Sequence, residues 1–252
     1  MRHRLIAGLI HLSLSAAVAA LVFLPIYFFW YPDILYDYAG GRDLFLLIVS
    51  VDVTLGPLIT TMIYVPRKWG LKFDLVVIGT LQALALAYGV YVLFESRPVY
   101  FVFVKDRFEL VRANDYPDEQ LAKSAKGYGA LPLPWRGPKI VGAKLPTNPK
   151  EQFDVMLSGI GGIDVHLMPR YYVPYEEVRS LAKQKGEPLE KLRERNPQHV
   201  DEVNALVANS RRREDELRFL PMRAGKTDFT VVIDAKTGEI VKISSIKPWG
   251  DV

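Results

Sequence analysis

Residues 44–65 read LFLLIVSVDVTLGPLITTMIYV, an apolar run that is long enough to cross a bilayer as a helix. The run contains one acid, Asp52, which is followed closely by the pair Gly56-Pro57. A carboxylate in hydrocarbon costs about 2.5–3.5 kcal/mol on insertion scales, and proline removes a backbone donor and favours a kink. Both features predict that Asp52 and Pro57 turn towards other helices and away from lipid.

Two further apolar runs, residues 5–30 and 75–94, flank this segment. The first resembles a signal peptide with Ala17-Val18-Ala19 as its cleavage site, but it stays apolar as far as Trp30. That length exceeds a signal region and favours a spanning helix. The aromatic residues from Tyr27 to Tyr31 suit the level of the lipid headgroups. We therefore predict three transmembrane helices, at about 5–30, 44–65 and 75–94.

Ionisable residues are distributed unevenly between two parts of the chain. Residues 1–94 contain six Lys or Arg and five Asp or Glu, whereas residues 95–252 contain 26 and 23. We predict a three-helix transmembrane domain at 1–94 and a water-soluble domain at 95–252, which is long enough for a core of its own. The net charge of +4 is spread thinly, so nucleic acid is not an expected partner. The chain has no cysteine, which excludes disulfides and thiolate metal sites.

The loops between the apolar runs differ in charge. Residues 31–43 carry three acids and one arginine, whereas residues 66–74 carry three basic residues and one acid. The positive-inside rule places the amino terminus and the second loop in the cytoplasm. Three crossings then leave residues 95–252 outside the inner membrane, in the periplasm of a Gram-negative cell.

The pattern of residues 95–252 predicts an extracytoplasmic α+β domain with antiparallel hairpins. Residues 99–111 and 229–243 read as hairpins, and 139–145 adds a strand. Asn148-Pro149 and Asn196-Pro197 each place an N-cap residue before a proline, and further helices are expected after Pro174 and Glu187. Residues 127–138, GYGALPLPWRGP, are a Gly/Pro-rich loop of open function.

Counting the helical rise from Leu44 puts Asp52 about 12 Å below the outer face, level with Ser15 and Ala17 on the first helix and Tyr88 on the third. His11 lies deeper, near Gln82, so an ion pair between Asp52 and His11 is disfavoured. Two roles for Asp52 remain open. It hydrogen-bonds within its own bundle, for example to Tyr88 or Ser15, or it helps to bind another membrane helix, and the two roles are compatible. Small residues on the first and third helices permit close approach, namely Ala16, Ala17, Ala19, Ala20, Ala83, Ala85, Ala87 and Gly89.

No pattern of catalytic or metal-binding residues is found, and no cofactor is expected. Asp52 has no second carboxylate inside a span, as an intramembrane aspartyl protease would need, and one acid does not make a proton path. The four histidines are far apart, so a metal site is not expected. Residues 158–163, SGIGGI, fit a helix end better than a phosphate loop, and Arg211–Arg213 fit a solvated helical face.

Several segments resemble the TfpX and TfpZ kind of type IV pilin accessory protein. They are VDVTLGPLIT, RPVYFVFVKDRFELV, MPRYYVPYEEV, LRFLPMRAGKTDFTVVIDAKTGEIVKI and the final KPW. The resemblance implies a non-enzymatic inner-membrane protein that accompanies a type IV pilin, affects its assembly or display as pilus, and meets the assembly machinery and membrane lipid. It singles out Asp52, Gly56, Pro57 and the RPVY and DRFE segments as typical positions.

The candidate partner-binding or helix-packing residues are therefore Asp52, Thr54, Gly56, Pro57, Ser15 and Tyr88. The periplasmic candidates are Arg97, Tyr100, Asp106 and Arg107. A hypothesis of another class is a membrane-anchored sensor whose outer domain binds a ligand in a pocket lined by the loop at 127–138.

Overall fold

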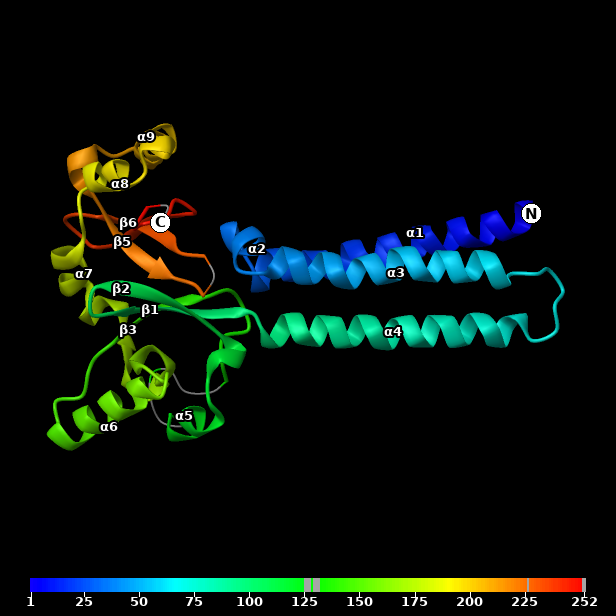
Figure 1. The fold of residues 1–252 in the computed structure, drawn as a ribbon, viewed down its shortest axis with the longest axis horizontal. Helices are drawn as coiled ribbons and strands as arrows, with labels where there is room; N and C mark the ends of the chain where they lie inside the picture. The colour runs from blue at the N-terminus through cyan, green and yellow to red at the C-terminus, as the bar shows by residue number, and fades with distance from the viewer. Residues whose placement is uncertain (125–127, 129–131, 226, 251–252) are drawn as a thin grey trace. The chain divides into compact units, whose positions relative to one another are not determined.

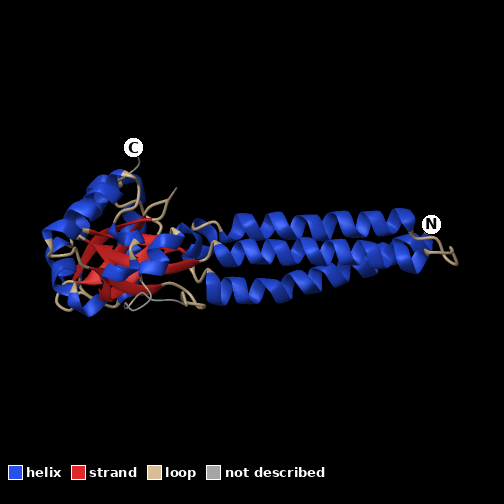
Figure 2. Cartoon of the chain, turned by 90° about the horizontal axis from the view of Figure 1, so that it is seen from below, coloured by secondary structure: helices blue, strands red, loops and turns tan. Residues whose placement is uncertain are grey.

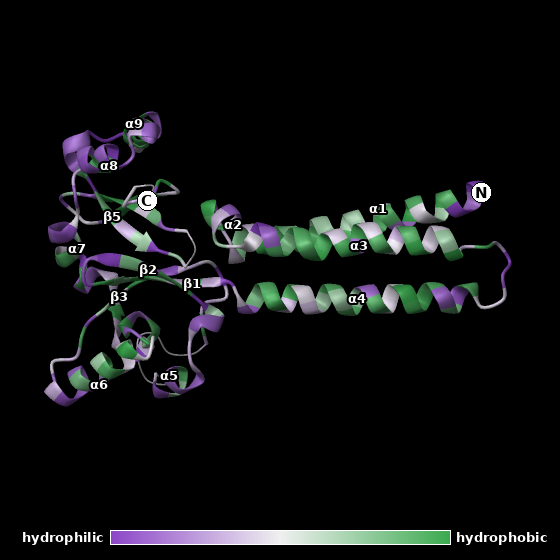
Figure 3. Cartoon of the chain, in the orientation of Figure 1, coloured by the Kyte–Doolittle hydropathy of each residue, from purple (hydrophilic) through white to green (hydrophobic). Residues whose placement is uncertain are grey.

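The computed structural model describes residues 1–250 except 125–127, 129–131 and 226 (Figure 1). The chain divides into two compact units, Met1–Arg97 and Pro98–Val252. Hydrophobic residues dominate the long helices of the first unit, whereas the second unit mixes hydrophilic and hydrophobic residues (Figure 3). The predicted loop at 127–138 lies partly outside the described residues.

The first unit contains three helices that are long and apolar enough to cross a membrane, as the three apolar runs predicted. They are α1 (Arg2–Pro25, continued by a π-helical turn at Ile26–Trp30), α3 (Gly41–Ile63) and α4 (Leu71–Glu95), with the short α2 (Ile34–Tyr38) before α3. They run side by side (Figure 2). Both α3 and α4 begin before their apolar runs. The residue before each helix is a glycine, Gly40 or Gly70, with a positive φ that favours glycine.

Aromatic residues pack the end of the bundle at which α1 ends and α3 begins. Tyr31 is fully buried, and its hydroxyl bonds the carbonyl of Leu93 at 3.2 Å and the hydroxyl of Ser96 at 3.0 Å. A Cβ on Gly41 would lie 2.8 Å from the Tyr31 ring. Part of the predicted headgroup cluster therefore ties the ends of α1, α3 and α4 together.

The second unit contains a mixed sheet of seven strands within its described residues, in the order β4-β3-β1-β2-β5-β6-β7. Both predicted hairpins are confirmed, as β1–β2 and β6–β7, and the predicted strand at 139–145 is β3. The parallel pairs β1–β3 and β2–β5 were not predicted. The strands are β1 (Pro98–Val104), β2 (Arg107–Arg112), β3 (Lys139–Ala143), β4 (Tyr172–Pro174), β5 (Leu217–Arg223), β6 (Phe229–Asp234) and β7 (Ile240–Ser244).

Strand β5 accommodates a proline inside the sheet. Phe219 exchanges backbone hydrogen bonds with Glu187 on the side of β5 that faces away from β6. Pro221 is two residues further along, so its nitrogen faces the same side. The missing N–H therefore removes no hydrogen bond from the β5–β6 ladder.

Helices cover the sheet. They are α5 (Asp118–Lys123), α6 (Pro149–Ile160), α7 (Arg179–Lys185), α8 (Leu189–Arg195) and α9 (Val200–Ser210). One core cluster joins α8 and α9 to β5, β6 and β7 through residues such as Leu192, Val203 and Phe219. A second cluster lies around β1, β2 and β3 and includes Val102, Val141 and Met168.

The predicted helix starts are confirmed in part. Asn148 caps α6, because its side chain accepts a hydrogen bond from the Lys150 N–H at 2.9 Å. The prediction for Asn196 is wrong, since its side chain makes no cap and instead donates to the carbonyls of Leu192 and Lys247. After Pro174 the chain first forms a 3₁₀ turn, and α7 begins at Arg179.

Two other predictions concern helix ends. Residues 158–163 end α6 as expected: the Ile163 N–H donates to the Ser158 carbonyl at 2.9 Å, and Gly162 has a φ of 88°. The helical face predicted at Arg211–Arg213 is wrong, because α9 ends at Ser210 and Arg211 has a φ of 55°. Arg212 there forms an ion pair with Asp234, so the segment is a turn held to β6.

Candidate functional site

Helix α3 contacts both α1 and α4, and glycines mark the closest approaches. A Cβ on Gly8 of α1 would lie 2.0 Å from the Thr61 hydroxyl, and one on Gly89 of α4 would lie 2.6 Å from the Ile48 side chain. A Cβ on Gly56 would lie 2.1 Å from the Gln82 amide nitrogen. The alanines of the predicted small-residue faces are exposed or half-buried. Glycine is needed at the positions where helix backbones approach most closely.

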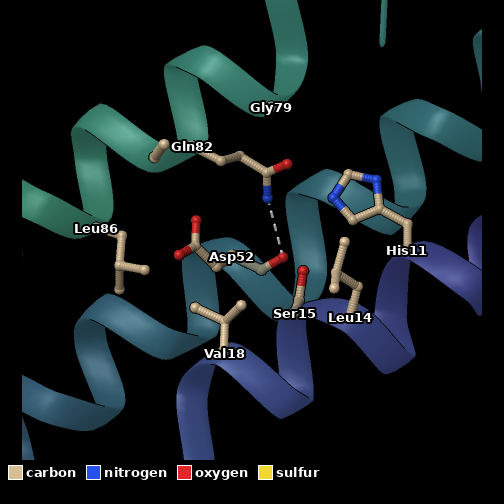
Figure 4. A pocket seen from close by; sticks show the side chains of 9 residues that line it. His11, Leu14, Ser15, Val18, Asp52, Gly79, Gln82 and Leu86 are labelled. Atoms are coloured by element: carbon tan, nitrogen blue, oxygen red, sulfur yellow. Dashed lines mark hydrogen bonds between the residues drawn. The ribbon is translucent and has the colours of Figure 1, made fainter. Parts of the chain in front are cut away.

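Asp52 and Gln82 form the polar centre of the bundle (Figure 4). The Gln82 amide nitrogen donates to the backbone carbonyl of Asp52 at 3.2 Å. Two buried side-chain atoms, Oδ1 of Asp52 and Oε1 of Gln82, have no hydrogen-bond partner among the described residues. Both are acceptors, and both are closed off from the surface of the bundle as the side chains stand.

Gly56 and Pro57 lie within α3, which continues through both to Ile63. The Thr61 hydroxyl donates to the Pro57 carbonyl at 2.7 Å, and Gly56 is buried against Gln82. Both residues therefore face the neighbouring helices, and neither ends α3.

His11 contacts α3 away from Asp52. Its Nδ1 lies 2.6 Å from the Thr60 hydroxyl, and Thr60 is buried. In the described part of the chain no ion pair joins His11 to Asp52.

A furrow runs between α1 and α4, with α3 beneath it. It consists of two adjoining cavities of about 180 and 410 Å³ that share His11, Leu14 and Gly79. Its α1 wall extends from His3 to Val18 and its α4 wall from Leu75 to Leu86, while α3 contributes Asp52, Thr60 and Tyr64. We call it the α1–α4 furrow. The side chains that line it are mainly apolar, and its polar members are His3, His11, Ser15, Asp52, Thr60, Tyr64 and Gln82.

The membrane candidates are dispersed over the bundle. Ser15 lines the furrow together with Asp52, whereas Thr54 is exposed on α3. Tyr88 is 70% exposed and lines a different groove, of about 360 Å³, between α3 and α4. Within the described residues neither Ser15 nor Tyr88 hydrogen-bonds to the Asp52 carboxylate. The two hydrogen bonds offered as examples are therefore absent.

Gln82 is the α4 residue that bonds Asp52, and the count of helical rise placed Asp52 too shallow to meet it. The count of helical rise began at Leu44, where the apolar run starts, but α3 begins at Gly41 and α4 ends at Glu95. Starting at Gly41 lowers Asp52 by about 4.5 Å and so narrows its offset from Gln82 from about 6 Å to about 3 Å, even though α4 ends one residue later than its apolar run.

The four candidates of the outer region have different surroundings. Arg97 is buried, donates to the Phe94 carbonyl at 2.6 Å and lies 3.7 Å from the centre of the Phe94 ring. Tyr100 is buried and its ring packs edge-on against Tyr172. Asp106 and Arg107 form a salt bridge at 3.0 Å in the β1–β2 turn. Of the four, Asp106 is exposed and Arg107 is half-buried, whereas Arg97 and Tyr100 are buried.

A groove of about 630 Å³ lies beside α6 in the second unit. It is lined by Lys105, Leu145, Gln152, Val155, Met156, Gly159, Ile160 and Asp164. None of these residues belongs to the loop at 127–138, from which the sensor hypothesis builds its pocket. Part of that loop lies outside the described residues.

Comparison with known proteins shows a common family. A fimbrial assembly protein of serogroups C1 and C2 from Dichelobacter nodosus is 36% identical over 118 residues, which cover 46% of this chain and 89% of the relative. The chain belongs to the fimbrial assembly protein family. Two other members from Dichelobacter nodosus, of serogroups I and E1, are 29% and 28% identical over 233 residues, which cover 89% of this chain and 88% of each relative. No family model matches the chain, and no solved structure matches it.

Proposed function

We propose that this chain is a non-enzymatic inner-membrane accessory protein that binds a type IV pilin subunit and modulates its assembly or display as pilus. Its relatives are named as fimbrial assembly proteins. The resemblance to the TfpX and TfpZ proteins supports the type IV class. The α1–α4 furrow is the observation that carries the binding role, because it gives the membrane unit an apolar surface that its own helices leave open.

The proposed topology follows from the loop charges. Arg67 and Lys68 lie between α3 and α4, and Lys72 lies in the first turn of α4, so this loop and the amino terminus are cytoplasmic. Residues 98–252 then lie in the periplasm. A pilin has an apolar helix in the membrane and a globular head outside it, so a protein with this topology can meet both parts and act like a chaperone.

The experiment is deletion of the gene in its native host, followed by complementation with the full chain. We expect the deletion to change the amount of surface pilus, and the pilin to copurify with the tagged chain from detergent-solubilised membranes. Unchanged pilus quantity together with no copurified pilin would refute the proposal. A control with the pilin gene deleted identifies proteins that bind the tagged chain independently of pilin.

A further inference from the structure

The length of the α1–α4 furrow sets the size of its occupant. Along α1 the furrow extends from His3 to Val18, which at the rise of a helix is about 22 Å. The hydrocarbon core of a bilayer is about 30 Å thick. A furrow that covers most of this depth matches a transmembrane helix better than a small molecule.

The α4 wall of the furrow is shaped for a close neighbour that this chain does not supply. Gly79 and Ala83 are one helical turn apart and both line the furrow. A Cβ added to Gly79 would meet no atom within 4 Å, in contrast to Gly8, Gly56 and Gly89, which contact another helix of the bundle. Small residues of this spacing permit close helix approach in membranes. Because no described residue fills the space above Gly79, a helix of another molecule can approach there.

The polar atoms of the furrow define the chemistry of the occupant. The Oδ1 atom of Asp52 and the Oε1 atom of Gln82 are buried acceptors without partners among the described residues. In hydrocarbon no water satisfies them, and an unsatisfied polar group costs free energy. Because both atoms are buried, a donor on the occupant bonds them only after the Asp52 and Gln82 side chains turn into the furrow. Lipid acyl chains have no such donors.

We propose that the α1–α4 furrow binds one transmembrane helix of another protein, which presents a hydroxyl, amide or amine donor to Asp52 and Gln82. The inference rests on the proposed function only in taking the pilin as the protein that brings this helix. A second copy of this chain and a lipid chain are the competing occupants.

Photo-crosslinking of the full chain in native membranes tests the occupant. A diazirine amino acid replaces Leu14, which lines the furrow and is 64% exposed, or Leu84, which is 63% exposed and does not line it. We expect an adduct with another protein from position 14 and little from position 84. Adducts only with lipid or with a second copy of this chain would overturn the proposal, as would equal yields from both positions.

Substitutions within the furrow test its shape and its chemistry separately. Gly79→Leu places a bulky side chain in the furrow at a position where an added Cβ meets no atom within 4 Å, so we expect the position-14 adduct to fall about tenfold. Ala87→Leu, at an exposed residue outside the furrow, should leave the adduct unchanged. Asp52→Leu should lower the yield about threefold to tenfold, the effect of one interhelical hydrogen bond. Asp52→Asn keeps an acceptor and should retain the adduct.

Peptide mapping of the adduct separates this inference from the proposed function. We expect the crosslinked segment to be apolar and to contain a donor residue within about one helical turn of the crosslink. A donor-bearing segment from a protein other than pilin would support the furrow and contradict the pilin assignment. A pilin segment with no donor, or an adduct that Asp52→Leu does not weaken, would overturn the donor chemistry and leave the proposed function standing.

Discussion

Asn196 shows how one side chain can have a different role from the one its sequence context indicates. It precedes Pro197 as an N-cap would, yet it is buried, with 1% of its surface exposed. Its amide nitrogen donates at 2.9 Å to the carbonyls of both Leu192 and Lys247, and so joins α8 to the carboxyl-terminal segment. The side chain therefore acts as a donor, whereas an N-cap acts as an acceptor.

Asn196→Asp distinguishes these two roles. An N-cap would tolerate aspartate, but here the change removes both donated bonds and places a carboxylate against two carbonyl oxygens. We expect a loss of about 2 kcal/mol or more in the free energy of unfolding, measured by urea denaturation. Asn148→Asp, at a cap that accepts a bond from Lys150, is the matched control and should be nearly neutral. Equal effects at both positions would contradict the assignment.

The Glu109 carboxyl should make the stability of the second unit depend on pH. Burial raises the pKa of this carboxyl from its usual value to about 7, although Arg223 and Arg107 partly offset the effect. The folded state therefore binds a proton more tightly than the unfolded state, and stability falls as pH rises from about 4.5 towards 7.

Glu109→Gln should remove this loss. We expect the variant to be more stable than the parent at pH 8, by roughly 1–3 kcal/mol, and similar to it near pH 4, in thermal unfolding followed by circular dichroism. Glu119→Gln is the control, because the Lys123 ammonium lowers the pKa of the Glu119 carboxyl and no gain is expected there. A Glu109→Gln variant that is less stable than the parent at pH 8 would show that the attraction of the Glu109 carboxylate to Arg223 and Arg107 outweighs the cost of burying its charge.

At the scale of elements, α3 is the helix on which the membrane unit is built. Gly8 and Gly89 bring α1 and α4 against it, and Gly56 makes room for the Gln82 side chain that bonds α3. The α1–α4 furrow exists because α1 and α4 pack on α3 and leave the space above Asp52 unfilled. Packing within the bundle and access to the furrow therefore depend on different glycines.

Gly8→Leu should loosen the contact between α1 and α3. The new side chain would meet the Thr61 hydroxyl, which is held by its bond to the Pro57 carbonyl and cannot easily move. We expect the free energy of unfolding to fall by about 1–3 kcal/mol, measured by thermal unfolding of the full chain in detergent. Gly79→Leu is the matched control and should leave the unfolding temperature unchanged or higher, since its Cβ meets nothing and leucine favours helix. A destabilised Gly79→Leu variant would show that the leucine clashes with other helices of the bundle, and that the furrow is not open at Gly79.

At the scale of the whole molecule, the two compact units meet in sequence at Arg97 and Pro98. We expect residues 98–252, expressed alone, to be soluble and to unfold in one cooperative transition, because the sheet and both core clusters lie within them. Circular dichroism follows the unfolding transition, and size-exclusion chromatography tests whether the fragment is soluble. Ile160→Lys, at an 80% exposed apolar residue of α6, controls for self-association through that helix. An insoluble or non-cooperative fragment carrying this change would contradict the independence of the unit.

Local patterns predicted much of the fold. Apolar length predicted α1, α3 and α4, and alternation with turn residues predicted the β1–β2 and β6–β7 hairpins, because these features depend on neighbours in the chain. The parallel pairs β1–β3 and β2–β5 escaped prediction, since they join strands far apart in sequence. Strand β4, with three residues, is too short to show alternation.

The candidate site, like the fold, was predicted from the sequence only in part. The sequence by itself determined that Asp52 lies, before Gly56-Pro57, in a helix long and apolar enough to span a membrane, since hydrophobic length and residue identity suffice for that. Only the tertiary structure decided that Gln82 bonds the Asp52 carbonyl, that Tyr88 faces outward, and that Gly79 borders an open furrow. Helix rotation and the exact offset between helices fix these contacts, and both come from side-chain packing across helices, which a count of residues along one helix does not contain.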